Sequence, residues 1–153
     1  RKSLMKLIHE NELEFIPLFD CNTYVYVWKK NPIASKSSVS LQELEMYTCL
    51  TFDQGKTNSF YFAEEVFSTY EYKQTIQVDD RASMLNLMVG LNGYTLCSGI
   101  ICEELNGSDY AAVPLKETEV MTIGYVKRKS IQLSELAQLY VNELAKYKKL
   151  VLK

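Results

Sequence analysis

The chain has 153 residues, enough for one substantial hydrophobic core or for two small lobes that share a core. Its 47% hydrophobic and 24% charged residues are typical of a folded globular protein and exclude a disordered one. The net charge of −2, from 17 basic and 19 acidic residues, argues against a surface that grips nucleic-acid phosphates. No apolar run approaches the ~20 residues that span a bilayer, so no membrane partner is expected.

The beginning of the sequence and its cysteines bear on the compartment. Arg1 is not an initiator Met, and no signal-peptide pattern follows it, so we interpret the chain as a fragment or a processed product. The cysteines are widely spaced and form no CxxC motif, which predicts reduced thiols without zinc or a disulfide. A cytoplasmic location is therefore expected. These cysteines are Cys21, Cys49, Cys97 and Cys102.

The first third of the chain predicts a short helix over residues 3–10, followed by two strands over residues 13–19 and 24–28. The second strand, YVYVW, is apolar on both faces, as in a strand that is covered on both sides. Ser40 and Glu43 have the spacing of a capping box, which predicts a short helix that continues to about Met46.

Strands and helices alternate through the rest of the chain, which predicts an α/β fold with a mixed or parallel sheet and helices on its faces. The helix that Asp79 and Asp80 open is apolar nearly all round, so we expect it to be deeply buried and to end at Gly93. The other predicted elements are strands at 49–52, 75–78, 94–97, 111–115 and 120–126, a helix capped by Asn58, a helical turn near 100–105, and a last helix from about Ser134.

Catalytic chemistry has little support in the sequence. His9 is the one histidine, and it lies on a polar helix face near the start, where a surface role is favoured over a catalytic one. No glycine-rich phosphate loop lies between a strand and a helix. Adjacent acidic residues on a helix point about 100° apart, so they do not clamp a bond or a metal together. We therefore expect a protein that is not an enzyme and that holds no metal and no cofactor.

Two polar segments remain as candidates for ligand binding, at residues 53–59 and 80–83. Each is predicted to follow a strand end and to begin a helix. Backbone amides at such a position carry partial positive charge and suit a carboxylate or a similar anion. Ordinary helix capping without a ligand is the alternative for both segments.

Several motifs, taken in order, resemble the effector-binding region of LysR-type transcriptional regulators. The resemblance covers nearly the whole chain, and although each motif is short, their order and spacing together are specific. The motifs are Phe15–Phe19 (FIPLF), Tyr24–Val27, Asn31–Ala34 (NPIA), Val39–Leu44, Val78–Asp80, Leu87–Gly93, Val113–Leu115, Met121–Tyr125 and Leu133–Ser134.

The resemblance implies two Rossmann-like lobes of the periplasmic-binding-protein type, joined by two crossing strands, with a small-molecule effector in the cleft. It assigns residues 31–116 to the second lobe, and residues 1–30 plus 117–153 to a partial first lobe. By comparison with the family, the first strand and helix of that lobe and the winged helix-turn-helix that binds DNA are absent. Leu91 also departs from the family, which often has a glycine there.

Carried over by position, the effector-facing residues of the second lobe lie in the two polar segments. Arg81 is the cation among them and is implied to pair with an effector carboxylate, with a structural salt bridge as the alternative. The implied set is Thr51, Asp53, Gln54, Gly55, Asn58, Ser59, Asp80, Arg81 and Ser83.

The implied partners are a small carboxylated metabolite and a second copy of the chain, with DNA bound only through the absent domain. The run from Asp79 to Tyr94 is similar to a Gram-positive branch in which some members respond to sulfur-assimilation metabolites. Two alternatives stay open: a periplasmic-type solute-binding protein, and a redox-sensing regulator that switches through Cys97 and Cys102.

Overall fold

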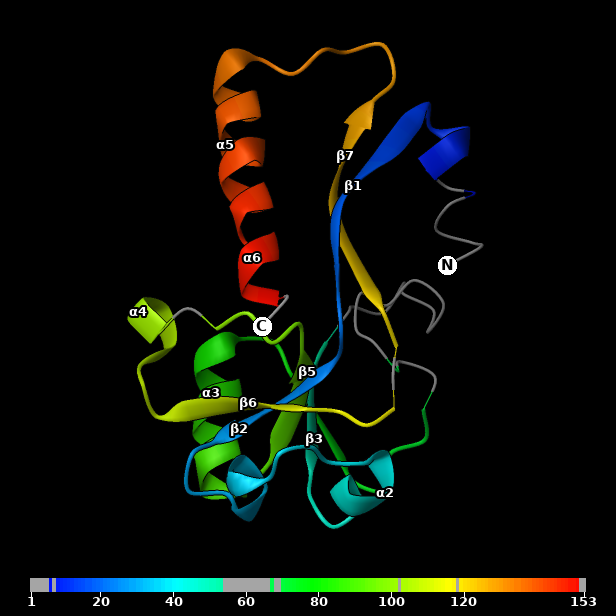
Figure 1. Ribbon diagram of the computed structural model, residues 1–153. Helices are drawn as coiled ribbons and strands as arrows, with labels where there is room; N and C mark the ends of the chain where they lie inside the picture. The colour runs from blue at the N-terminus through cyan, green and yellow to red at the C-terminus, as the bar shows by residue number, and fades with distance from the viewer. Residues whose placement is uncertain are drawn as a thin grey trace.

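Two sheets organise the molecule, a five-stranded sheet and a two-stranded ribbon (Figure 1). The computed structural model describes residues 6, 8–53, 67, 70–101, 103–117 and 119–151. Its elements are β1 (Leu13–Cys21), β2 (Tyr24–Trp28), the 3-10 helix η1 (Pro32–Ser35), α2 (Leu41–Leu44), β3 (Cys49–Phe52), β4 (Thr75–Val78), α3 (Arg81–Gly90), β5 (Tyr94–Cys97), α4 (Glu103–Asn106), β6 (Tyr110–Pro114), β7 (Met121–Arg128), α5 (Glu135–Lys146) and α6 (Lys148–Val151).

The five-stranded sheet has the order β4-β3-β5-β2-β6 and is mixed, which confirms the predicted α/β class. Strand β3 pairs in parallel with β4 and β5, whereas β2 pairs antiparallel with β5 and β6. The three central residues of β2 are buried, as the apolar character of both its faces predicts.

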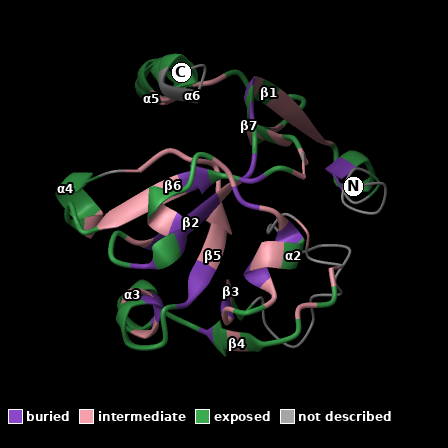
Figure 2. Ribbon diagram, turned by 60° about the horizontal axis from the view of Figure 1, so that its bottom comes forward, coloured by how far each residue is buried: buried purple, intermediate pink, exposed green. Residues whose placement is uncertain are grey.

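Two core clusters lie on opposite faces of this sheet, because neighbouring residues of a strand point to opposite sides. Val25 and Val27 pack with Leu41 and Leu44 of α2 on one face. Tyr26, between them, packs on the other face with residues of α3. Buried residues are accordingly concentrated in this part of the molecule (Figure 2). We refer to residues 24–115 as the five-stranded half.

The ribbon consists of β1 and β7, which pair antiparallel from Leu13 opposite Arg128 to Cys21 opposite Met121. Helix α5 packs along β1 through a half-buried stripe, and α6 follows it toward the five-stranded half (Figure 1). Ser134 caps α5, as predicted, by accepting a hydrogen bond from the Ala137 amide. We refer to residues 13–21 and 121–151 as the ribbon half.

Capping decides where the short helices begin. The predicted capping box at Ser40 and Glu43 is confirmed, since each residue's side chain accepts a hydrogen bond from the other's backbone amide. Helix α2 ends at Leu44, two residues before the predicted end. The helix predicted to start at Asn58 lies outside the described residues.

The prediction of deep burial for α3 is wrong. Met84 and Met88 are buried, but Val89 on the same helix is 37% exposed. The helix packs with one side on the sheet, and within the described part of the chain its outer side stays in contact with solvent. It also ends at Gly90 with Leu91 as its C-cap, three residues before the predicted end.

Two short segments cross between the halves. Asn22 and Thr23 lead from β1 to β2, and residues after Leu115 lead from β6 to β7. The predicted division into lobes, 31–116 against 1–30 with 117–153, stays a prediction. Strand β2, which precedes that boundary, is hydrogen-bonded into the five-stranded sheet.

Candidate functional site

The carboxyl ends of the parallel strands face the crossing segments. Tyr24, the first residue after the first crossing, pairs with Cys97 at the carboxyl end of β5. Because β3 and β4 run parallel to β5, their carboxyl ends lie at the same edge of the sheet. This edge is where open α/β sheets bind ligands.

Strand β3 brings two predicted site residues to this edge. Thr51 is half-buried within the strand and pairs with Gln77 of β4. Asp53 follows the strand, is exposed, and its amide donates to the carbonyl of Val78 at 2.8 Å. Four further predicted residues lie outside the described part of the chain: Gln54, Gly55, Asn58 and Ser59.

The N-terminus of α3 supplies the other described residues of the predicted site. Asp80 is the N-cap, and its carboxylate accepts a hydrogen bond from the Ser83 amide at 2.8 Å. Hydrogen bonds from Ser83 hold the pKa of Asp80 below its ordinary value, so this carboxylate is charged at neutral pH. Arg81 and Ser83 are exposed on the first turn.

The Arg81 guanidinium has no carboxylate within 4.0 Å among the residues that the structure describes. The structural salt bridge weighed as its alternative role is therefore not formed within this part of the chain. The exposed side chain of Arg81 lies at the edge that also carries Asp53 and Asp80. Five fixed donors and a permanent charge make it suited to a carboxylate ligand.

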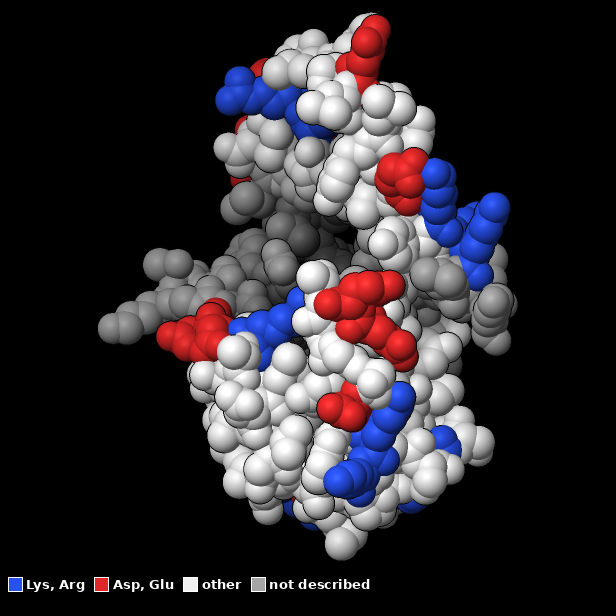
Figure 3. All heavy atoms as spheres, turned by 90° about the vertical axis from the view of Figure 1, so that its left-hand side faces the viewer, with Lys and Arg blue, Asp and Glu red and all other residues white. Residues whose placement is uncertain are grey.

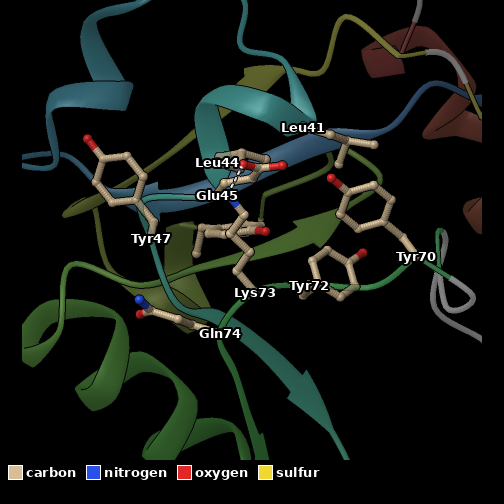
Figure 4. A pocket seen from close by; sticks show the side chains of 9 residues that line it. Leu41, Leu44, Glu45, Tyr47, Tyr70, Tyr72, Lys73 and Gln74 are labelled. Atoms are coloured by element: carbon tan, nitrogen blue, oxygen red, sulfur yellow. Dashed lines mark ion pairs between the residues drawn. The ribbon is translucent and has the colours of Figure 1, made fainter.

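A shallow depression lies at the opposite edge of the sheet, at the amino ends of β3, β4 and β5 (Figure 4). Tyr47, Tyr70, Tyr72 and Tyr94 line it, and the ion pair between Lys73 and Glu45, 2.5 Å between nitrogen and oxygen, crosses it. It leaves about 0 Å³ of space for even a water-sized molecule, whereas typical ligand pockets have ~300–1,000 Å³. This depression could not be predicted from the sequence, because its tyrosines come from separate segments.

Two of the described thiols, those of Cys21 and Cys97, are poorly suited to redox sensing. Cys21, Cys49 and Cys97 form no disulfide, and Cys102 is outside the described residues. Burial raises the pKa of Cys97 to about 11 and also raises that of Cys21. A thiolate is the reactive form, so these two groups are unreactive at neutral pH.

The surface shows no continuous basic stripe on the face that Figure 3 presents, where acidic and basic side chains are interspersed. The same view shows that the surface is hollowed between the upper and lower parts of the molecule. Among the described residues there is no group of three or more His, Cys, Asp or Glu side chains that could hold a metal ion. In this part of the chain no helix is long and apolar enough to cross a membrane.

Known proteins place the fold in a class that senses small molecules. The family model described as the LysR substrate binding domain matches residues 4–149. The chain therefore belongs to the LysR substrate-binding domain family, the ligand-sensing part of LysR-type transcription regulators. No curated protein matches the chain.

Solved structures agree on the fold at low sequence identity. HinK, a LysR family transcriptional regulator from Pseudomonas aeruginosa, is 17% identical with a TM-score of 0.65, and the match covers 98% of this chain and 58% of HinK. The effector-binding domain of QuiR in complex with shikimate is 18% identical, with a TM-score of 0.60 and coverage of 92% and 67%. CbnR complexed with its target DNA is 17% identical, with a TM-score of 0.59 and coverage of 90% and 48%. The chain thus spans less than three fifths of HinK and less than half of CbnR.

Proposed function

We propose that this chain senses a small carboxylated metabolite for a LysR-type transcription regulator. The metabolite binds between the five-stranded half and the ribbon half, at the carboxyl ends of β3 and β4. The observation that carries the proposal is the exposed Arg81 on the first turn of α3, at the sheet edge that faces the crossing segments. The shikimate bound to QuiR, itself a carboxylate, supports this class of ligand.

The chemistry of the site supports an anionic ligand in two ways. The N-terminus of α3 carries partial positive charge, and the guanidinium adds a full charge beside it. The Asp80 carboxylate caps the helix by accepting a hydrogen bond from the Ser83 amide. This hydrogen bond aligns the first turn. Thr51 and Asp53 flank this turn on the neighbouring strand, and Gln54, Gly55, Asn58 and Ser59 complete the proposed set.

Titration calorimetry of the intact regulator with a panel of small carboxylates tests the site. Arg81→Ala and Ser83→Ala should each weaken binding about tenfold or more, since a charge-assisted hydrogen bond contributes ~1.5–3 kcal/mol. Arg128→Ala, on the exposed end of β7, is the matched control and should bind normally. Unchanged affinity in both site variants would remove the site assignment and leave the fold intact.

The larger setting of the domain is also part of the proposal. The chain binds no DNA by itself, and the regulator binds DNA through a winged helix-turn-helix outside this chain. It works in the cytoplasm, catalyses no reaction, and associates with itself through the ribbon half. Residues 31–116 form one lobe, and residues 1–30 with 117–153 form part of the other. CbnR, solved with its target DNA, supports the DNA-binding setting.

Gel-shift titration of the isolated chain checks the DNA statement. The net charge of −2 and the interspersed charges of Figure 3 predict no complex at ~200 mM salt, where phosphate contacts are screened. Binding that persists at that salt concentration would contradict the proposal.

A further inference from the structure

The second crossing segment is tied to the five-stranded half by side chains as well as by backbone. Leu115 forms a parallel bridge with Val39, and the Lys116 amide donates to the carbonyl of Val39 at 2.8 Å. Glu117 then turns its carboxylate toward α2, where it accepts from the amide of Leu41 at 3.0 Å. These contacts join residues 76 or more apart in the sequence.

Glu119 forms two further hydrogen bonds with the rest of the chain. Its carboxylate accepts from the amide of Phe67 at 2.9 Å. Its carbonyl accepts from the hydroxyl of Thr23 at 2.8 Å. Thr23 belongs to the first crossing segment and is 1% exposed, so Glu119 connects both crossings with the five-stranded half at one place.

Phe67 has a conformation that needs such support. Its φ of 54° lies in the left-handed region, which residues other than glycine rarely adopt and which persists where the surroundings hold it. Its carbonyl accepts from the Tyr70 amide at 2.9 Å and from the Tyr72 hydroxyl at 3.2 Å. Those two bonds come from its own segment, whereas the bond to Glu119 comes from the crossing.

The ribbon begins immediately after this point. Met121 is the first residue of β7 and pairs with Cys21, so the two strands move together from there on. Between the ribbon and the ties lie Asn22 on one crossing and Val120 on the other. Glu119 and Thr23 thus each lie two residues from the end of the ribbon.

We propose that Glu119 is a positioning residue that sets the orientation of the ribbon half against the five-stranded half. It does so by fixing the second crossing to Phe67 and to Thr23. The inference rests on the proposed function in one respect: a ligand that binds between the halves is sensitive to their orientation. Glu119 is the residue that holds this orientation of the two halves.

Distance measurements between the halves test the proposal without any ligand. Spin labels on unnatural amino acids at Val89 of α3 and Leu139 of α5, both exposed, report the orientation; the chain's four cysteines rule out thiol labels. Glu119→Ala should broaden the distance distribution relative to the wild type. Glu119→Gln keeps an acceptor oxygen and should restore the narrow distribution. Glu71→Ala removes an exposed carboxylate and should leave the distribution unchanged.

Amide hydrogen exchange gives the second readout. The Phe67 amide should exchange about tenfold faster in Glu119→Ala, a factor that corresponds to ~1.4 kcal/mol. Faster exchange with an unchanged distance distribution would overturn the proposal, because the bond would then exist without setting the orientation. Equal broadening in Glu71→Ala would overturn it too.

If Glu119→Ala does not fold, Thr23→Val decides the matter. Valine has the shape of threonine and lacks the hydroxyl that donates to the Glu119 carbonyl. A broadened distribution in this variant supports the proposal, and a wild-type distribution overturns it. Loss of ligand binding in Arg81→Ala with a wild-type orientation separates a failure of this inference from a failure of the proposed site.

Discussion

The two halves of the molecule differ in how far their apolar side chains are buried. In the five-stranded half, Val25, Val27 and Leu50 are 0% exposed. In the ribbon half, α5 has no buried residue, and Leu136, Leu139 and Tyr140 are 77%, 62% and 66% exposed. These three positions have the i, i+3, i+4 spacing of one helix face.

The difference follows from the number of layers. The five-stranded sheet has α2 on one face and α3 on the other, so both sides of a central strand are covered. In the ribbon half, α5 packs on a sheet of two strands, and two strands alone cannot cover a second side of that helix. Helices form in both halves, but an apolar helix face is buried only where a second layer packs on it.

Leu50→Ala in the five-stranded half is the change with the largest expected effect. Removing most of a fully buried side chain should lower the free energy of unfolding by ~2–5 kcal/mol, from lost burial and the cavity left behind. Urea denaturation of the isolated chain measures it. Leu105→Ala, at a site that is 76% exposed, is the control and should change the free energy little. Equal effects would mean that the contrast in burial has no energetic counterpart.

Gly124→Ala tests whether the ribbon half contains any tightly packed position. A Cβ at Gly124 of β7 would overlap the carbonyl oxygen of Ile16 and lie 2.6 Å from the Phe15 ring. Backbone atoms cannot move aside cheaply, so we expect ~1–3 kcal/mol of destabilisation in urea unfolding. Gly90→Ala is the matched control, because nothing lies within 4 Å of its Cβ position. Equal stability of the two variants would contradict the close packing of β1 against β7.

Local signals predicted most of the elements. The spacing of Ser40 and Glu43 identified α2, and the YVYVW segment identified a buried central strand, because both depend on residues near in sequence. Parallel pairing of β3 and β4 then brings Asp53 and Asp80 to one edge, as a strand-helix alternation predicts. The burial of α3 was overestimated, because its sequence does not reveal that only one of its sides faces a sheet.

Long-range contacts could not be predicted in the same way. Glu117 reaches Leu41 and Glu119 reaches Phe67 across 76 and 52 residues. A carboxylate in a polar connecting segment is expected to be solvated. Nothing near it in the sequence indicates which backbone amide donates a hydrogen bond to it. The role of the crossing segments can therefore be recognised only from their hydrogen-bond partners in the structure.

Glu43→Gln sharpens the comparison through pH. Hydrogen bonds from Lys36, Ser40 and Lys116 hold the pKa of Glu43 well below its ordinary value. The charged form thus stabilises the folded state above the unfolded pKa of ~4.3, and this contribution is lost as the pH falls below that value. The difference in unfolding free energy between wild type and variant should be full at pH 7 and shrink below pH ~4. Unfolding curves across this range measure it, with Glu71→Gln as the control. A constant difference would show that charge has no part in it.

Leu136→Ala should have the smallest effect on folding. It tests whether the uncovered apolar face of α5 binds a second copy of the chain. A side chain that is 77% exposed has little burial to lose, so the unfolding free energy in dilute solution should change by less than ~0.5 kcal/mol. Self-association is where a loss is expected, because an apolar face beside open strand edges invites a second chain. Sedimentation equilibrium should show association weakened about fivefold, equivalent to ~1 kcal/mol. Met46→Ala, at an 83% exposed apolar site on the five-stranded half, is the control. If Met46→Ala weakens association as much as Leu136→Ala, the contact is not centred on α5. If the wild type sediments as a monomer at tens of micromolar, the uncovered face alone does not bring two chains together.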